Sequence, residues 1–229
     1  MLKSCGQDST GRAAFEELCQ AYWRPLYAFL RRKGRSPQDA EDVIQGFFVW
    51  FMERGLAERA DPKRGRFRNF LLAALRQFEA RQFQYQSAEK RSPERPTVSL
   101  DFGDGEANYP SYGTDDKTPE MLFEQTWAAS VLDRAMAALR DDMSAAGKER
   151  LFDCLRRMMT DGRDSTTKQA AQQLGMSEGA VRVAVHRMKR RFAKKVRAVV
   201  AETVENEADI DDEMNELFVI LQQSSSFSW

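Results

Sequence analysis

Apolar residues recur at three- and four-residue steps along most of this chain, and no segment alternates apolar with polar residues as a half-buried strand does. The first such stripe lies near the N-terminus and consists of Phe15, Leu18, Tyr22, Leu26, Phe29 and Leu30. A stripe with this spacing occupies one face of a helix, and that face must pack against other elements. The sequence therefore predicts an all-α fold.

The residues that follow the first stripe contain signals that end one helix and begin another. Gly34 is expected to end the first helix, Ser36 to cap the second, and Pro37 to take its first position. The first turns of the second helix are acidic, as the helix dipole favours. These acidic residues are Asp39, Glu41 and Asp42.

The segment at residues 91–117 shows no periodicity and is rich in Pro, Gly, Ser and Asp, which is typical of a linker. A flexible chain of this length spans about 30 Å between its ends. A helix is expected to begin again at Thr118-Pro119. We therefore expect two small helical domains, residues 1–91 and 118–200, joined by a flexible acidic linker at 92–117 and followed by an acidic C-terminal extension at 201–229.

The formal net charge is zero, but the charges are unevenly distributed along the chain. Counted as Lys and Arg less Asp and Glu, the balance is +6 for residues 1–91 and +9 for residues 146–200. It is −7 for residues 92–145 and −8 for residues 201–229. Because phosphates respond to local clusters of cations, the two basic blocks favour a polyanionic partner. Chance segregation of charge on helical surfaces is the alternative.

Residues 167–192, TKQAAQQLGMSEGAVRVAVHRMKRRF, have the spacing of a helix-turn-helix. Thr166 and Gln169 form a capping-box pattern that is expected to begin the first short helix. Gly175 can take the left-handed conformation that ends this helix, and Ser177 then caps the second. The alternative is an ordinary helical hairpin with a solvated basic face.

The second helix of this motif has two faces when its residues are placed about 100° apart. The core face carries Val181, Ala184, Val185, Met188 and Phe192, and the opposite side carries Gly179, Arg182, Val183, His186, Arg187 and Arg190. Arg182 is suited to a bidentate contact with guanine and Val183 to a thymine methyl group. Basic residues farther along, Lys189, Arg190, Arg191, Lys194 and Lys195, suit phosphate contacts.

A second set of basic residues lies in the loop before the third helix and on that helix. Arginines mixed with aromatics, as in RFRNF and RQFQYQ, suit single-stranded nucleic acid, because cations hold the backbone while rings receive unstacked bases. For any single aromatic residue here, core packing is the better interpretation. The residues of the set are Lys63, Arg64, Arg66, Arg68, Asn69, Arg76, Gln77 and Arg81.

The second helix is apolar almost all round. Val43, Ile44, Phe47, Trp50 and Phe51 lie on one side, and Val49 and Met52 lie nearly opposite, beside Gln45 and Asp42. Such a helix is either fully buried or covered by a partner. In a domain of this size we favour a partner surface.

Several function classes find no support in the sequence. The longest apolar run, GFFVWFM at residues 46–52, is far too short to span a bilayer, and no apolar signal core begins the chain, so we expect neither export nor a membrane partner. Three scattered cysteines suit reduced thiols in a cytoplasm. With one histidine, no metal-ligand spacing and no phosphate-cradling glycine loop, we expect no metal, no cofactor and no enzyme.

Three motifs together resemble bacterial RNA polymerase sigma factors of the extracytoplasmic-function group, within the sigma-70 family. Residues 39–54, DAEDVIQGFFVWFMER, are similar to the family's polymerase-clamp helix, where a D-A-E-D-x-x-Q pattern precedes aromatics. Residues 61–81, DPKRGRFRNFLLAALRQFEAR, resemble the segment that opens and reads the −10 promoter element. Residues 167–192 resemble the module that reads the −35 element, so the likeness covers nearly the whole chain in the correct order.

The resemblance implies a sigma factor that binds core RNA polymerase and promoter DNA and catalyses no reaction itself. The polymerase clamp would contact Asp39, Glu41, Asp42 and Gln45, to which the outward apolar side of the helix adds Val49 and Met52. The basic loop and third helix would hold the separated −10 strand. The −35 element would be read by Ser177, Glu178, Gly179, Arg182, Val183, His186, Arg187, Lys189, Arg190 and Arg191.

Two further interpretations remain open at this point. A helix-turn-helix transcriptional regulator, with residues 1–91 as a sensing domain, would bind DNA without replacing a sigma subunit. The acidic extension at 201–229 carries eight acids and no bases, so it is expected either to fold over the adjacent basic block and restrain DNA binding, or to serve as a packing element or dock. An anti-sigma factor or other regulator would be the partner in the docking case.

Overall fold

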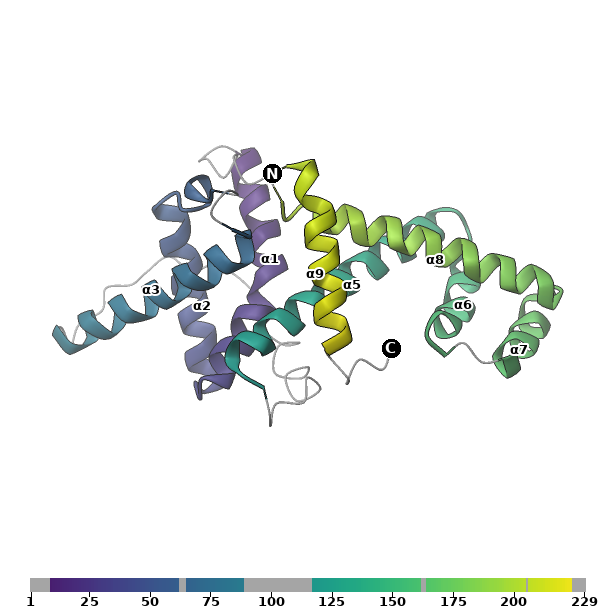
Figure 1. Ribbon diagram of the computed structural model, residues 1–229, viewed down its shortest axis with the longest axis horizontal. Coiled ribbons are helices and arrows are strands. Elements are labelled where there is room, and N and C mark those ends of the chain that lie inside the picture. Colours follow the sequence, from purple (N-terminus) through teal and green to yellow (C-terminus); the bar gives the residue numbers. More distant parts are fainter. Residues whose placement is uncertain (1–8, 62–64, 89–116, 162–163, 205, 224–229) are drawn as a thin grey trace.

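The computed structural model describes residues 9–61, 65–88, 117–161, 164–204 and 206–223, and every regular element among them is helical. This confirms the predicted all-α fold. In chain order the elements are α1 (Ser9–Arg32), α2 (Pro37–Glu53), the 3-10 helix η2 (Ala57–Arg59), α3 (Phe67–Ala88), α5 (Pro119–Ala145), α6 (Glu149–Asp161), α7 (Asp164–Leu174), α8 (Glu178–Ala201), the 3-10 helix η5 (Glu207–Asp209) and α9 (Ile210–Gln223). In Figure 1, α1, α2 and α3 form one end of the molecule and α6 and α7 the other, with α5 and α8 running between them.

The first helix boundaries follow the local chemistry of the turn between them. Gly34 has φ +89° just after α1, in the left-handed region that a glycine enters without steric cost. Ser36 Oγ accepts a hydrogen bond from Asp39 N at 3.1 Å, and Pro37 is the first residue of α2. Thr118 Oγ1 begins α5 in the same way, by accepting from Met121 N at 3.2 Å. The predicted helix starts at Ser36 and Thr118 are therefore confirmed.

Aromatic rings of α2 lie at the centre of the contact with α3. Phe47 is fully buried, and its ring centre lies 5.5 Å from that of Phe51 and 5.9 Å from that of Phe78 in α3. Gly46 permits this close approach, because a Cβ at that position would lie only 3.2 Å from Phe78 Cζ. Large buried rings contribute most to core energetics. The apolar side of α2 is thus used mainly within the fold.

The long helix α5 belongs to two hydrophobic cores. Its first half packs along α1, and Phe123, Trp127 and Leu132 share one core with residues of α1, α2 and α3. Its second half, at Leu139 and Met143, packs with α6, α7 and the start of α8. The division into domains at residues 91 and 118 stays a prediction. The packing of α5 on α1 is a contact that the sequence did not indicate.

The acidic extension contributes a folded helix to the first core. α9 packs against α5 and α8, and in Figure 1 it lies across α5 at the middle of the molecule. The buried residues that join the core are Val196, Val199 and Val200 of α8 and Ile210, Leu217 and Ile220 of α9. α9 and the end of α8 therefore belong to the same hydrophobic core as α1, α2 and α3.

Within the described ranges, no helix is long and apolar enough to cross a bilayer. The same residues bring together no group of three or more His, Cys, Asp or Glu side chains that could hold a metal ion.

Candidate nucleic-acid and polymerase interfaces

The helix-turn-helix is formed by α7 and α8. Gly175 joins them with φ +62°, and Ser177 Oγ accepts a hydrogen bond from Ala180 N at 3.2 Å to begin α8. Both roles agree with the sequence prediction. The first helix differs, because α7 already includes Asp164 and Thr166 lies inside it rather than at its cap. Serine and threonine are tolerated in a first turn when the backbone continues the helix, so the capping-box pattern placed the helix start three residues late, at Thr167 rather than Asp164.

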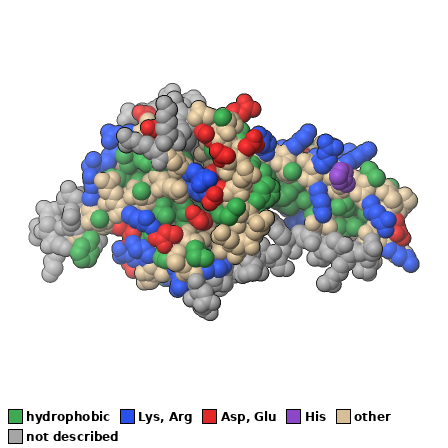
Figure 2. Space-filling model, viewed as in Figure 1, with side chains coloured by type: hydrophobic (Ala, Val, Ile, Leu, Met, Phe, Trp, Pro, Cys, Tyr) green, Lys and Arg blue, Asp and Glu red, His purple; other side chains and the backbone are tan. Residues whose placement is uncertain are grey.

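The apolar face of α8 packs as its helical period predicts. Val181 and Met188 are buried against α5, α6 and α7, with Ala184, Val185 and Phe192 partly buried beside them. All ten residues predicted to read the −35 element are exposed: Ser177, Glu178, Gly179, Arg182, Val183, His186, Arg187, Lys189, Arg190 and Arg191. Figure 2 shows basic side chains gathered over α8 on the face in view. The structure brings this predicted set to the solvent side of one helix.

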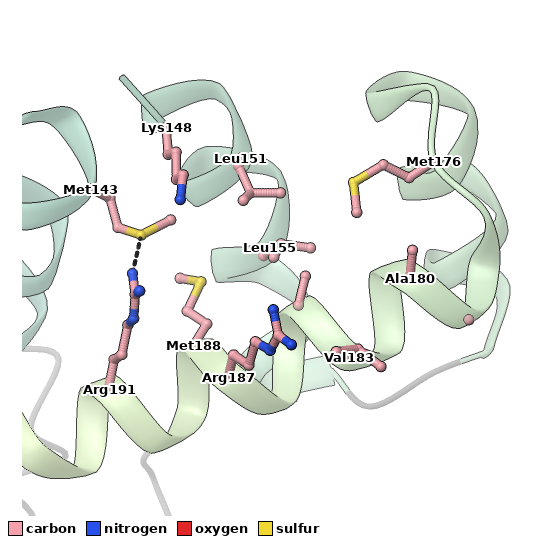
Figure 3. A pocket seen from close by; sticks show the side chains of 12 residues that line it. Met143, Lys148, Leu151, Leu155, Met176, Ala180, Val183, Arg187, Met188 and Arg191 are labelled. Carbon is pink, nitrogen blue, oxygen red and sulfur yellow. Dashed lines mark hydrogen bonds between the residues drawn. The ribbon is translucent and has the colours of Figure 1, made fainter. Parts of the chain in front are cut away.

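Beside this face lies a hollow of about 430 Å³ between α5, α6 and α8. Met143, Met176 and Met188 line it, and Figure 3 shows Arg191 pointing toward Met143, whose Sδ lies 3.5 Å from the Arg191 Nη1 donor. Arg187 and Val183 line the same hollow. The sequence did not predict it, because its walls come from three separate helices.

The first basic segment is divided between the surface and the interior. Lys63 and Arg64 fall outside the described residues. Three predicted residues on α3, Asn69, Arg76 and Gln77, are exposed, while Arg66 and Arg81 are partly buried. The Arg81 guanidinium lies 5.8 Å from the ring centre of Trp50 in α2. The exposed residues lie at the surface, where Arg76 pairs with Glu120 of α5, and the set is not one continuous exposed patch.

Arg68 is the clearest departure from the sequence prediction. Its side chain is 1% exposed and forms an ion pair with Glu213 of α9, which is itself buried. The Arg68 guanidinium also lies over Trp127 of α5, 4.3 Å from the ring centre. A buried charge requires such partners, because desolvation of an unpaired guanidinium is very costly. Arg68 is therefore not available to DNA in this conformation, contrary to its predicted role.

Arg66 belongs to the same cluster. Its Nε lies 2.8 Å from Glu213 Oε2, and its Nη2 donates to Glu216 Oε2 at 3.2 Å. Glu124 of α5 also lies within the field of this cluster: burial raises the pKa of its carboxyl, and the charge of Arg68 opposes that rise. Burial likewise raises the pKa of the Tyr22 hydroxyl, with the negative charge of Glu213 adding to the effect.

The acidic extension thus pairs chiefly with the first basic block. The extension also contacts residues 146–200, since α9 packs on α8 and Asp211 pairs with Arg197 there. That it restrains DNA binding stays a prediction. Ion pairs also hold α5 to its neighbours. Arg76 of α3 pairs with Glu120, and Arg134 Nη2 donates to Glu202 Oε2 at 2.6 Å.

The predicted polymerase-binding residues of α2 differ in their exposure to solvent. Asp39, Asp42 and Met52 are exposed, and Glu41 and Gln45 are partly buried. Val49 is buried, so the prediction that it faces a partner is not met in this conformation. Val49 belongs to neither of the two hydrophobic cores formed by the described residues, although it is only 5% exposed. Asp39 also has a local role, since its carboxylate accepts from Ser36 Oγ at 2.7 Å.

Sequence reasoning missed Trp127, Glu213 and Glu216. In the sequence Trp127 belongs to an apolar stripe with helical spacing, and such a stripe does not predict a stacked arginine. The acidic run without bases was the only local signal for the two glutamates, and it did not identify their partners.

Comparison with known proteins identifies one part of the chain. Residues 18–88, from α1 to the end of α3, match the family model of sigma-70 region 2. No curated protein and no solved structure matches the chain. The match supports a sigma-70 family sigma factor, with a role in promoter recognition and with core RNA polymerase and promoter DNA as its partners. It covers the predicted clamp-binding and −10 residues, and the helix-turn-helix lies beyond it.

Proposed function

We propose that this protein is a sigma factor of the extracytoplasmic-function group that binds core RNA polymerase and directs promoter-specific initiation of transcription. The match of residues 18–88 to sigma-70 region 2 is the observation that carries the proposal. In this role the protein performs no covalent chemistry and needs no cofactor, since the polymerase forms the RNA. It acts in the cytoplasm, where polymerase and promoter meet.

Core polymerase would dock on the outer side of α2. Asp42 and Met52 are exposed there, with Met52 45% accessible, and Glu41 and Gln45 lie partly exposed on the same helix. An exposed methionine beside carboxylates suits a protein interface, because its flexible thioether adapts to a partner surface while the charges orient it. Asp39 is exposed at the start of the same helix.

The separated −10 strand would bind along α3. Asn69, Arg76 and Gln77 are exposed on this helix, and Phe83 near its end is 74% exposed. Cationic and polar groups that follow a backbone, with an aromatic ring on which a base can stack, are the components of single-strand binding sites. Arg66 and Arg68, with Lys63 and Arg64 before them, would extend this track when they are accessible.

The −35 element would be read by α8. Arg182 and Val183 lie in the first two turns of the helix, on its exposed side, where a recognition helix contacts base edges. Lys189, Arg190 and Arg191 are exposed farther along and would contact phosphates, which position the helix without specifying sequence.

Run-off transcription with purified core polymerase tests this function. The protein is expected to direct initiation at specific promoters only when core enzyme is present. Asp42→Arg, which reverses an exposed charge on α2, should abolish initiation, while Asp153→Arg, the same change at an exposed site on α6, should not. If no promoter supports initiation and the protein alone gives a sharp sequence-specific footprint, it is a helix-turn-helix regulator and not a sigma factor.

A further inference from the structure

The C-terminal helix α9 presents two carboxylates to the two arginines that flank the start of α3. Arg66 contacts Glu213 at 2.8 Å and Glu216 at 3.2 Å, and Arg68 pairs with Glu213 in the interior. Figure 1 shows α9 at the middle of the molecule, close to both halves. We call Arg66, Arg68, Glu213 and Glu216 the latch. It joins residues about 145 positions apart in the chain.

The latch uses the same donors that a nucleic-acid backbone requires. A guanidinium binds carboxylate and phosphate oxygens with the same planar fork of N–H groups. Each N–H that donates to Glu213 or Glu216 is therefore unavailable to a phosphate. Both arginines lie in the segment that the proposed function assigns to the −10 strand, so α9 and that strand compete for them.

The closed cluster is not ideally satisfied. The carboxylates of Glu213 and Glu216 pair with the two arginines, and the partly buried carboxyl of Glu124 interacts electrostatically with all four groups. Arg68 Nε is buried without a hydrogen-bond partner among the described residues. A purely structural contact at this place would be better served by apolar side chains, because buried ion pairs rarely stabilise a fold more than packing does. Polar groups in such an arrangement suit a contact that opens.

The position of α9 couples the latch to the rest of the molecule. α9 packs on α5 and α8, and α5 in turn packs along α1. Release of α9 would therefore remove the carboxylates of Glu213 and Glu216 from Arg66 and Arg68, and it would leave the stack of Arg68 on Trp127 of α5 as the remaining cover of that side chain. The recognition face of α8 is exposed with α9 in place, so the latch acts on the first basic segment.

We propose that α9 is an intramolecular competitor of nucleic acid, which withholds Arg66 and Arg68 until the latch opens. The inference rests on the proposed function, because that function gives these arginines their DNA role. Beyond the proposed function, Glu213 and Glu216 occupy the binding groups of these arginines, and α9 must move away from α3 before a nucleic acid can bind them.

The test is equilibrium binding of the full chain to a fluorescein-labelled oligothymidine, measured by anisotropy over a range of salt concentrations. The Glu213→Gln/Glu216→Gln variant removes the competing charges without changing side-chain size. The Glu207→Gln/Asp212→Asn variant removes the same charge from exposed positions of the extension that form no ion pair with a described residue. It is the matched control for net charge.

The latch variant is expected to bind the single strand at least tenfold more tightly than the wild type, and the control within about twofold. Because two more phosphates would be contacted, its salt slope should steepen by about 1.4. Equal affinities for the two double variants, or an unchanged slope, would overturn the inference. If circular dichroism shows that the latch variant has lost helix, Glu216→Gln is compared with Asp212→Asn, and equal affinities there overturn it as well.

Run-off transcription by the same proteins separates this inference from the proposed function. If the wild type, the control and the latch variant all fail to initiate with core polymerase, the sigma function is lost whatever the affinities are. If the wild type initiates normally but the two double variants bind single strands equally, only the latch is refuted.

Discussion

The guanidinium of Arg68 lies 4.3 Å from the ring centre of Trp127, and the two side chains are buried together between α3 and α5. This stack places a cation of the first basic segment against the helix that continues to the helix-turn-helix. It also provides one wall of the site in which Glu213 of α9 is held. The stability of the closed structure should therefore depend on Trp127 more than on any exposed apolar residue of α5.

Truncation of Trp127 tests that dependence. Trp127→Ala should lower the free energy of unfolding by about 3–5 kcal/mol, since it removes a large buried ring and leaves a cavity. Met121→Ala, at a position on the same helix that is 41% exposed, should change it by less than about 1 kcal/mol. Urea denaturation followed by circular dichroism gives both values. Similar small losses for the two variants would show that the stack contributes little.

The buried pair of Arg68 and Glu213 predicts a strongly non-additive mutant cycle. Glu213→Ala should destabilise the protein by about 3–5 kcal/mol, because it leaves the guanidinium buried without its partner. The double variant Arg68→Met/Glu213→Leu should recover most of that loss, since apolar side chains of similar size fill the same space. Unfolding free energies of Arg68→Met, Glu213→Leu and the double variant give the coupling. Additive losses would contradict a direct buried pair.

The pKa of Glu124 predicts how stability depends on pH. Burial raises the pKa of this carboxyl in the folded state, so between its ordinary and raised values the folded protein binds more protons than the unfolded one. Stability contributed by this group therefore falls as pH rises through the raised pKa. Glu124→Gln should be more stable than the wild type at pH 8, and the difference should shrink toward pH 5. Thermal unfolding at both values measures it, and a constant difference would contradict the prediction.

Two glycines near the turn of the helix-turn-helix predict opposite effects of alanine. Gly175 has φ +62°, so Gly175→Ala should cost about 1–2 kcal/mol from backbone strain, although its Cβ would meet open space. Gly179 is the second residue of α8, and a Cβ there also meets nothing within 4 Å. Gly179→Ala should therefore stabilise the protein, by less than the roughly 1 kcal/mol found in the middle of a helix. Denaturant unfolding of the pair isolates the backbone effect, and changes of the same sign would refute it.

The two kinds of contact proposed for α8 predict different binding defects. In the complex with core polymerase, Arg182→Ala should weaken binding to the preferred −35 sequence by about 1–3 kcal/mol while other sequences change little. Lys189→Ala should weaken binding to all sequences alike and lower the salt slope by about 1. Competition binding with a set of −35 variants distinguishes them. A uniform loss for Arg182→Ala would mean that it contacts only phosphate.

Local chemistry alone predicted most of the helices and their ends. Ser36, Thr118 and Ser177 cap helices through hydrogen bonds to backbone atoms three residues away, and Gly175 turns the chain with its own φ. The exposed face of α8 follows from its helical period. These features depend on residues only a few positions apart, so the sequence is sufficient to predict them.

Only the tertiary structure determined that Arg68 and Val49 are buried and that the acidic extension packs as a helix against α5 and α8. Sequence placed Arg68 among surface cations, yet Glu213, 145 residues away, pairs with it in the interior. Whether a cation binds a phosphate or a carboxylate depends on which group the packing of α5 and α9 brings near it. Local periodicity carries no information on such pairings, because their free energy comes from burial and charge shared between distant segments.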